Sequence, residues 1–403
     1  MNQPTLYSSN NESLYEPELS NLLARSNHIK DFKFGRLAGT WLDGEVVKAL
    51  FTNHQPHYLV FIDAIDFRSL VDALQRIDPR RLQCLTSLTM NLKSETVSSS
   101  LVPSVLRCFK NIVFLSLISM NFSLLDFQAV CAIVGDSSVL SSLDLSRNQL
   151  SKGYVQSLVT AMQVKNNVKK LTLNYCFMPD SAAKPLLLSL QKKRCALRHL
   201  YLNGNHLEGA HAALLISTNK LETLTLTENA FTGAAIQKMY ESLADNDTLT
   251  TLAIGCERCE MRPTRLKTLP PNVMTRNHTL EELSLISVVL SNEFYETLFI
   301  DLCTNTTMRF LRLDPNQLSF VPSAPLVALL TSNRALSTLH LGHANFTPLH
   351  DGRLISAAMR NNPSLVQFLG GCAFTGRNRH NLHLKTLSLA SLAFDRFVER
   401  LPI

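Results

Sequence analysis

Few side chains in this sequence have the spacing of a reactive or metal-binding site. Cys256 and Cys259 are separated by two residues, as in one half of a zinc site, but no second such pair and no paired histidine accompanies them. We interpret both thiols as free. Histidines gather late in the chain, at His340, His343 and His350, and we interpret them as surface residues rather than ligands. The sequence therefore predicts no metal site.

Motifs that support covalent or phosphate chemistry are also missing from the sequence. It contains no phosphate-binding loop, no Gly-x-Ser-x-Gly and no His-Glu-x-x-His. Each of these motifs places a nucleophile, a base or a phosphate cradle where the reaction needs it. We therefore expect no enzymatic activity and no cofactor.

Charge and hydropathy narrow the kinds of partner and the compartment. The formal net charge is +7, and the segment Thr160 to Leu200 carries eight Lys or Arg residues against the single acid Asp180. No aromatic residues interleave with these cations as stacking platforms, so we expect a protein partner with an acidic surface rather than nucleic acid. Without an apolar run of about 18 residues or a signal peptide, we expect a cytoplasmic chain with no membrane span.

One pattern recurs through most of the chain and must position any functional side chains. It reads L-x-x-L-x-L-x-x-N-x-L, and its clearest copy runs from Leu140 through Asn148 to Leu150. Other copies start, at intervals near 28 residues, at Ile29, Leu59, Leu85, Ile112, Val168, Leu197, Leu221, Leu249, Leu280, Met308, Leu336, Leu365 and Leu384. The alternating L-x-L core predicts a strand, and the spacing after it predicts a helix.

This pattern resembles the ribonuclease-inhibitor-like class of leucine-rich repeats, with 28- to 29-residue units. The resemblance implies an α/β solenoid shaped as a horseshoe, with parallel strands on the concave face and helices on the convex face. Junctions such as Asn246-Asp247-Thr248-Leu249 also resemble those of innate-immune receptors and Ran GTPase activators. We expect a polar N-terminal cap over 1–28, about 13 to 14 units over 29–393 with an irregular loop at 255–271, and a C-terminal cap over 394–403.

The asparagine position of the repeat is not always asparagine. It is Asn148, Asn205, Asn229 and Asn316 in four copies, but Met120, Cys176, Val288 or Ala344 in others. The asparagine side chain can satisfy backbone groups of the neighbouring turn, and a buried unsatisfied group costs about 1–3 kcal/mol. We expect the departing copies to pair their turns differently and Cys176 to serve in packing.

The variable positions of each strand predict the binding surface. They alternate with the buried leucines, so we expect Leu145 and Leu202 in the core and residues such as Asp144 exposed on the concave face. The expected partner-binding residues are the aromatic, cationic and polar members of this face: Lys170, Asn174, Tyr175, His199, Tyr201, Asn203, Thr225, Glu228, Phe310 and Arg312. Tyrosine and arginine are among the side chains that dominate protein interfaces.

These observations favour a monomeric, non-enzymatic module that binds a protein on its concave face. A cytosolic chain made of eroded repeats resembles the leucine-rich-repeat effectors that intracellular bacteria inject into host cells. The alternative is a regulator of the Ran-activator type, in which an arginine stabilises the charge of phosphoryl transfer in a bound GTPase. Arg147, Arg309 and Arg312 are its candidate residues.

Overall fold

The fold was taken from a computed structural model of the 403-residue chain, which divides into two compact units, Met1–Asn205 (unit 1) and His206–Ile403 (unit 2). The structure describes residues 30–35, 44–62, 67–92, 99–163, 167–190, 195–209, 211–218, 220–256, 265–266, 269–314, 320–342, 345–346 and 349–369. The expected terminal caps, 1–28 and 394–403, lie outside these residues, as does most of 255–271. Each unit is described by itself.

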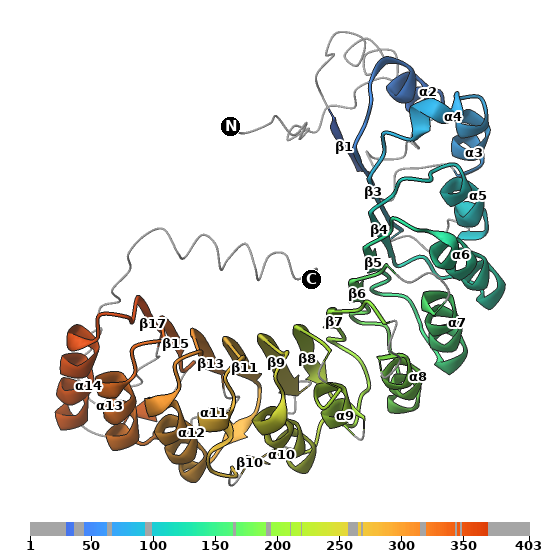
Figure 1. Ribbon diagram of the computed structural model, residues 1–403. Helices are drawn as coiled ribbons and strands as arrows, with labels where there is room; N and C mark the ends of the chain where they lie inside the picture. Colours follow the sequence, from blue (N-terminus) through green and yellow to red (C-terminus); the bar gives the residue numbers. More distant parts are fainter. Residues whose placement is uncertain are drawn as a thin grey trace. The chain divides into compact units, whose positions relative to one another are not determined.

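Unit 1 alternates strands with helices (Figure 1). Its elements are β1 (Asp31–Gly35), α2 (Gly44–Asn53), β2 (Tyr58–Ile62), α3 (Phe67–Gln75), α4 (Pro79–Leu82), β3 (Ser87–Asn91), η1 (Ser99–Leu101), α5 (Val102–Arg107), β4 (Phe114–Ile118), α6 (Leu124–Asp136), β5 (Ser142–Asp144), α7 (Lys152–Met162), β6 (Lys170–Thr172), α8 (Asp180–Leu190) and β7 (His199–Tyr201). The strands from β1 to β7 pair in sequence order, each parallel to the next. The helices lie on one side of this sheet.

Unit 2 repeats the arrangement with shorter extra strands. Its elements are α9 (Ala212–Ile216), β8 (Thr223–Asn229), α10 (Gly233–Glu241), η2 (Ser242–Asp245), β9 (Thr251–Cys256), β10 (Arg265–Leu266), α11 (Val273–Arg276), β11 (Glu282–Ile286), β12 (Val289–Leu290), α12 (Asn292–Thr304), β13 (Phe310–Asp314), β14 (Phe320–Val321), α13 (Ser323–Ser332), β15 (Thr338–His340), β16 (Asn345–Phe346), α14 (Leu349–Asn361) and β17 (Gln367–Leu369). Strands β8, β9, β11, β13, β15 and β17 pair in parallel, and β10–β12 and β14–β16 form separate pairs. The short strand β10 lies inside the segment expected to be irregular.

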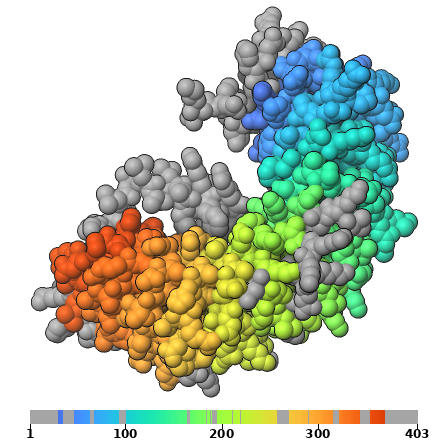
Figure 2. Space-filling view, viewed as in Figure 1, coloured from blue at the N-terminus to red at the C-terminus, as the bar shows by residue number. Residues whose placement is uncertain are grey.

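The leucines of the repeat form the core of each unit. In unit 1, Leu115, Leu143, Leu171 and Leu200 occupy the same position on successive strands and are at most 5% exposed. Leu145 and Leu202, two residues further along their repeats, are equally buried. Figure 2 shows the repeats within each unit as adjoining bands in sequence order. The predicted α/β leucine-rich-repeat solenoid is confirmed, because each unit buries its apolar side between its strands and its own helices.

One repeat start was placed wrongly. Leu59 pairs with Leu88 on β3, and Leu88 is the second leucine of the repeat that starts at Leu85. Leu59 is therefore also a second leucine, and the buried Pro56 takes the first position. The predicted start at Leu59 is therefore three residues too late, because a search for leucines does not recognise the proline in the first position.

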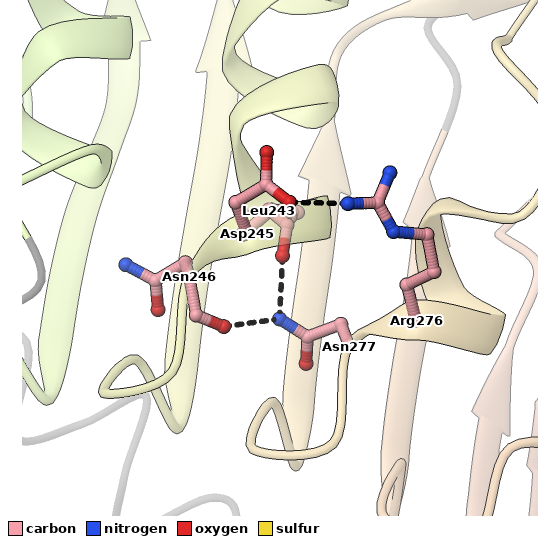
Figure 3. A network of polar contacts seen from close by, with 5 residues as sticks. All are labelled: Leu243, Asp245, Asn246, Arg276 and Asn277. Carbon is pink, nitrogen blue, oxygen red and sulfur yellow. Dashed lines mark hydrogen bonds and ion pairs between the residues drawn. The ribbon is translucent and has the colours of Figure 1, made fainter.

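Buried asparagines connect the repeats of unit 2 at the turns between helices and strands. We call Asn246, Asn277, Asn305, Asn333 and Asn362 the asparagine ladder. Asn277 Nδ2 donates to the carbonyls of Leu243 at 2.7 Å and Asn246 at 3.0 Å in the preceding repeat (Figure 3). Its Oδ1 accepts the N–H groups of Thr279 at 3.2 Å and Leu280 at 2.8 Å. The other members bond in the same way, so the asparagines at these turns also join adjacent repeats.

A different set of contacts closes the turns after the strands of unit 1. Asn148 Nδ2 donates to the Leu117 carbonyl at 2.8 Å, and its Oδ1 accepts from the Met120 amide at 2.8 Å. Where the repeat has Cys176, the thiol donates to the Leu145 carbonyl at 3.3 Å. Burial raises the pKa of this thiol to about 12, so it keeps the proton that it donates. Cys176 therefore does more than pack, and the expected difference between asparagine and non-asparagine turns is confirmed here.

Candidate protein-binding surface

The side of each sheet that faces away from the helices carries the variable residues, and we call it the strand face of that unit. In unit 1 the strand register aligns them in two rows across β1 to β7. The first row is Asp31, Tyr58, Ser87, Phe114, Ser142, Lys170 and His199, and the second is Lys33, Val60, Thr89, Ser116, Asp144, Thr172 and Tyr201. The predicted residues Lys170, His199 and Tyr201 thus lie on two adjacent strands.

Two tyrosines of this face stand beside cations. The Lys170 Nζ lies 5.0 Å from the centre of the Tyr201 ring, and the guanidinium carbon of Arg147 lies 5.5 Å from that of Tyr175. Both distances are within the range of a cation–π interaction. Both tyrosines are half-buried, which leaves an exposed edge that a partner can contact.

The position of Tyr175 depends on a left-handed backbone turn after each strand. Arg147, Tyr175 and Gly204 occupy this turn in successive repeats, with φ of 61°, 55° and 63°. A Cβ at Gly204 would lie 2.2 Å from the Tyr175 ring, so only glycine lets the ring occupy this place. The ring is therefore held between the Arg147 guanidinium and the backbone of Gly204.

Two expected contact residues of unit 1 are internal. Asn174 and Asn203 are 2% and 5% exposed, and the Asn174 Oδ1 accepts the Asn203 amide at 2.9 Å. The Asn174 amide in turn donates to the Ser146 hydroxyl at 3.3 Å. These side chains bond adjacent repeats together, so the surface left for a partner is smaller than the sequence predicted.

Asp144 departs from its predicted exposure. It is half-buried at the centre of the strand face of unit 1, and its Oδ1 accepts the Ser146 amide at 2.9 Å and the Ser146 hydroxyl at 2.6 Å. Its Oδ2 has only a long contact of 3.5 Å with the Ser116 hydroxyl. Burial raises the pKa of the Asp144 carboxyl, although the Ser146 bonds and the charge of Lys170 act in the opposite direction. The prediction of a freely exposed Asp144 is wrong because the neighbouring repeats enclose it.

Replacing Asp144 with asparagine is expected to change how stability depends on pH. Because the folded-state pKa is raised, neutral Asp144 favours folding below the ordinary aspartate pKa, and this contribution is lost as pH rises through the folded-state value. Asparagine cannot ionise and still offers an oxygen to Ser146. Urea unfolding should show the wild type losing stability relative to Asp144→Asn as the pH rises above the ordinary aspartate pKa of about 3.9 and through the raised pKa of folded Asp144. Asp31→Asn, at an exposed position, serves as the control. If stability relative to the wild type changed equally with pH in Asp31→Asn and Asp144→Asn, the pH dependence could not be assigned to Asp144.

The predicted residues of unit 2 are spread over its sheet. Thr225 on β8 is 4% exposed, whereas Phe310 and Arg312 lie on β13, three strand positions away. Arg312 Nη2 forms an ion pair with Asp314 Oδ2 at 2.8 Å. Glu228 is exposed, with a left-handed φ of 56°. The structure therefore does not join these four residues into one site.

The candidates for GTPase regulation and for metal binding are three arginines and two cysteines, and several of them contact the protein's own backbone or side chains. Arg147 and Arg309 are both exposed, although Arg309 Nη1 donates to the Ala335 carbonyl at 3.2 Å, and the half-buried Arg312 is paired with Asp314. Cys256 is buried, and its predicted neighbour Cys259 lies outside the described residues. Within the described ranges, no three His, Cys, Asp or Glu side chains converge as metal ligands, and no helix has the length and apolarity to cross a bilayer.

Of the expected cations, few gather on the strand face. Lys165, Lys192, Lys193 and Arg194 lie outside the described residues. Lys184 belongs to α8, on the helix side, and Arg198 donates to the backbone carbonyl of Leu197 at 2.9 Å. Lys170 is therefore the described member of the basic segment that the strand register places on this face.

Sequence reasoning missed the most exposed aromatic residues of the strand face. Tyr58 on β2 is 41% exposed and Phe114 on β4 is 53% exposed, with Ser87 between them in the first row. We call these two rings the Tyr58–Phe114 patch. The alternation around Leu88 and Leu115 could have revealed them, but these N-terminal repeats fit the leucine pattern least well.

Comparisons with known proteins agree with the repeat architecture. No family profile matches the chain. Over 158 residues it is 27% identical to the ribonuclease inhibitor of Sus scrofa, covering 38% of this chain and 34% of the inhibitor. Over 169 residues it is 27% identical to NACHT, LRR and PYD domains-containing protein 4C of Mus musculus, covering 40% of this chain and 17% of that protein.

A solved structure shows a similar arrangement at lower identity. The leucine-rich repeat-containing protein LegL7 from Legionella pneumophila aligns with a TM-score of 0.43 at 14% identity, over 83% of this chain and 100% of that chain. The matched region spans about a third or less of the length of the two sequence relatives, the ribonuclease inhibitor and the NACHT, LRR and PYD domains-containing protein.

Proposed function

From the ribonuclease-inhibitor-like leucine-rich-repeat fold of this chain, we propose that the strand face of unit 1 binds a partner protein around Tyr175 and Tyr201. The observation that carries this proposal is the pair of tyrosines held beside Arg147 and Lys170. Rings that are fixed before binding contribute contact area at little entropic cost. The two cations would face carboxylates of the partner.

Double replacement of Tyr175 and Tyr201 by alanine tests the proposal. We expect binding to weaken by more than about 2 kcal/mol, roughly thirty-fold, because the variant loses both aromatic anchors. The partner is first isolated with the wild-type chain from a cell lysate, and the dissociation constants are then measured by calorimetry. Far-ultraviolet circular dichroism of the variant checks that it folds.

The matched control replaces exposed apolar residues on the helices. Leu125 on α6 and Ile300 on α12 are 78% and 61% exposed. Their replacement by alanine should leave the dissociation constant unchanged. Full affinity of the tyrosine variant, or equal losses in both variants, would place the interface elsewhere.

We propose that binding, rather than catalysis, is the activity of the chain. This is supported by the lack of a nucleophile–base or phosphate-binding motif in the sequence and by a strand face of hydrogen-bonded polar residues. Single-turnover assays with nucleotide, acyl and ubiquitin substrates should give no product. Faster GTP hydrolysis by a small GTPase, abolished by alanine at Arg147, Arg309 or Arg312, would support the regulator function instead.

Action inside a host cell and a monomeric state stay predictions from the sequence. A reporter enzyme fused to the chain, expressed in an intracellular bacterium that secretes effectors, tests the first. Reporter signal in the host cytosol is the expected result, and signal confined to the bacterium would contradict it. Light scattering tests the second and should give a mass of about 45.0 kDa.

A further inference from the structure

The strand face of unit 1 holds a carboxylate, Asp144, that lacks an ion-pair partner among the described residues. No described Lys, Arg or His lies within ion-pair distance of Asp144. Lys170 is the nearby cation, but its ammonium lies against the Tyr201 ring. The hydrogen bonds from Ser146 occupy Oδ1, and the contact of Oδ2 with Ser116 is long at 3.5 Å. Oδ2 therefore retains capacity for a donor that comes from outside.

Burial makes the charge of this carboxylate unfavourable in the free protein. It raises the pKa of Asp144, so the environment stabilises the anion less than water does. An incoming Lys or Arg would supply the missing charge and donors in the same place. Charge-assisted hydrogen bonds of this kind are among the strongest at interfaces.

Phe114, one of the two rings of the Tyr58–Phe114 patch, lies on the strand next to this carboxylate. Phe114 pairs with Ser142 on β5, and Asp144 is two residues further along β5. Strand spacing and rise place the two Cα atoms roughly 8 Å apart, diagonally across the sheet. The residues next to them in the rows are Ser87, Ser116, Ser142 and Thr172, which are small and leave room above the sheet.

We propose that the strand face of unit 1 recognises a protein segment in which an aromatic or large aliphatic residue lies close to a lysine or arginine. The apolar side chain covers Phe114 and Tyr58, and the basic side chain binds Asp144. This inference rests on the proposed function, because it names the partner chemistry of the same strand face. Residues two apart on an extended segment are about 6.6–6.8 Å apart, and residues three or four apart on a helix have Cβ atoms about 5–6 Å apart. The length of a Lys or Arg side chain lets either arrangement reach both Phe114 and Asp144.

A random dodecapeptide library displayed on phage provides the probe, selected on the immobilised full-length chain. We expect enriched peptides to carry Lys or Arg two to four positions from an aromatic or large aliphatic residue. Synthetic copies should bind Asp144→Asn at least tenfold more weakly and Phe114→Ser at least fivefold more weakly than the wild type. Asparagine keeps the size and the Ser146 hydrogen bonds of Asp144, and Phe114 is half exposed, so both variants are expected to fold.

The controls separate this inference from the proposed function. Peptides that bind Asp144→Asn and Phe114→Ser at full affinity, but fail on Tyr175→Ala/Tyr201→Ala, would overturn the inference and leave the proposed function standing. Failure to enrich any peptide on the wild type over the Asp144→Asn/Phe114→Ser double variant would also overturn the inference. Exchange of the basic residue in a binding peptide for glutamate should abolish wild-type binding, and unchanged affinity would contradict the role of Asp144.

Discussion

Replacing Leu145 or Leu202 with alanine is expected to lower the free energy of unfolding by roughly 2–5 kcal/mol, the range measured for buried leucines. Both side chains are at most 1% exposed and lie between the sheet and the helices of unit 1. In a solenoid a cavity weakens both neighbouring interfaces of a repeat, so little of this loss can be recovered by collapse. Urea unfolding followed by circular dichroism measures the effect.

Gln149→Ala is the matched control for the leucine variants. Gln149 lies in the same repeat as Leu145 but is exposed, so its replacement should cost under about 0.5 kcal/mol. Similar losses for Leu145→Ala and Gln149→Ala would contradict the placement of Leu145 in the core.

The sequence predicted the repeat and its register correctly where leucines fill the pattern. A slip of one residue exposes every leucine of a strand, so the positions of Leu143 and Leu171 allow one register only. At β2 the same reasoning failed because Pro56 stands in the first leucine position. The architecture could therefore be predicted from periodicity, whereas the start of an irregular repeat could be found only from the pairing of its strand with the neighbouring strand.

The candidate surface was predicted only in part because exposure depends on adjacent repeats. The pattern correctly directed Asp144 and Asn174 away from the leucines, but it gave no sign that neighbouring strands enclose them. The left-handed turn at Arg147 and Tyr175 was equally hidden, since neither residue type favours positive φ. Only Gly204 signals this turn in the sequence, and the Tyr175 ring that lies over it comes from the preceding repeat.

The asparagine ladder also shows that contacts between repeats could not be predicted from local sequence. The sequence indicated turns at Asn277 and Asn305, because asparagine favours turns. Hydrogen bonds to the preceding repeat, such as that from Asn305 Nδ2 to the Met274 carbonyl at 2.7 Å, depend on how closely the repeats stack. Local sequence therefore located these residues, and the tertiary structure revealed why they are buried.

Replacing Asn305 with alanine is expected to destabilise unit 2 by roughly 2–4 kcal/mol, because buried groups of both repeats lose their partners. The carbonyls of Met274 and Asn277 lose donors at 2.7 and 3.0 Å, and the amides of Thr307 and Met308 lose an acceptor at 3.0 and 2.8 Å. Hydrogen exchange should show lost protection at Thr307 and Met308, together with a lower urea midpoint.

The control for the ladder is Asn361, an exposed asparagine at the end of α14 next to the ladder residue Asn362. Asn361→Ala should change stability by under about 0.5 kcal/mol. Asn305→Asp separates the two halves of the interaction, since it keeps the acceptor for Thr307 and Met308 but removes both donors. It also places a charge in a buried turn, so it should be at least as destabilising as alanine. Near-wild-type stability of Asn305→Asp would show that the donors to Met274 and Asn277 do not hold the repeats together.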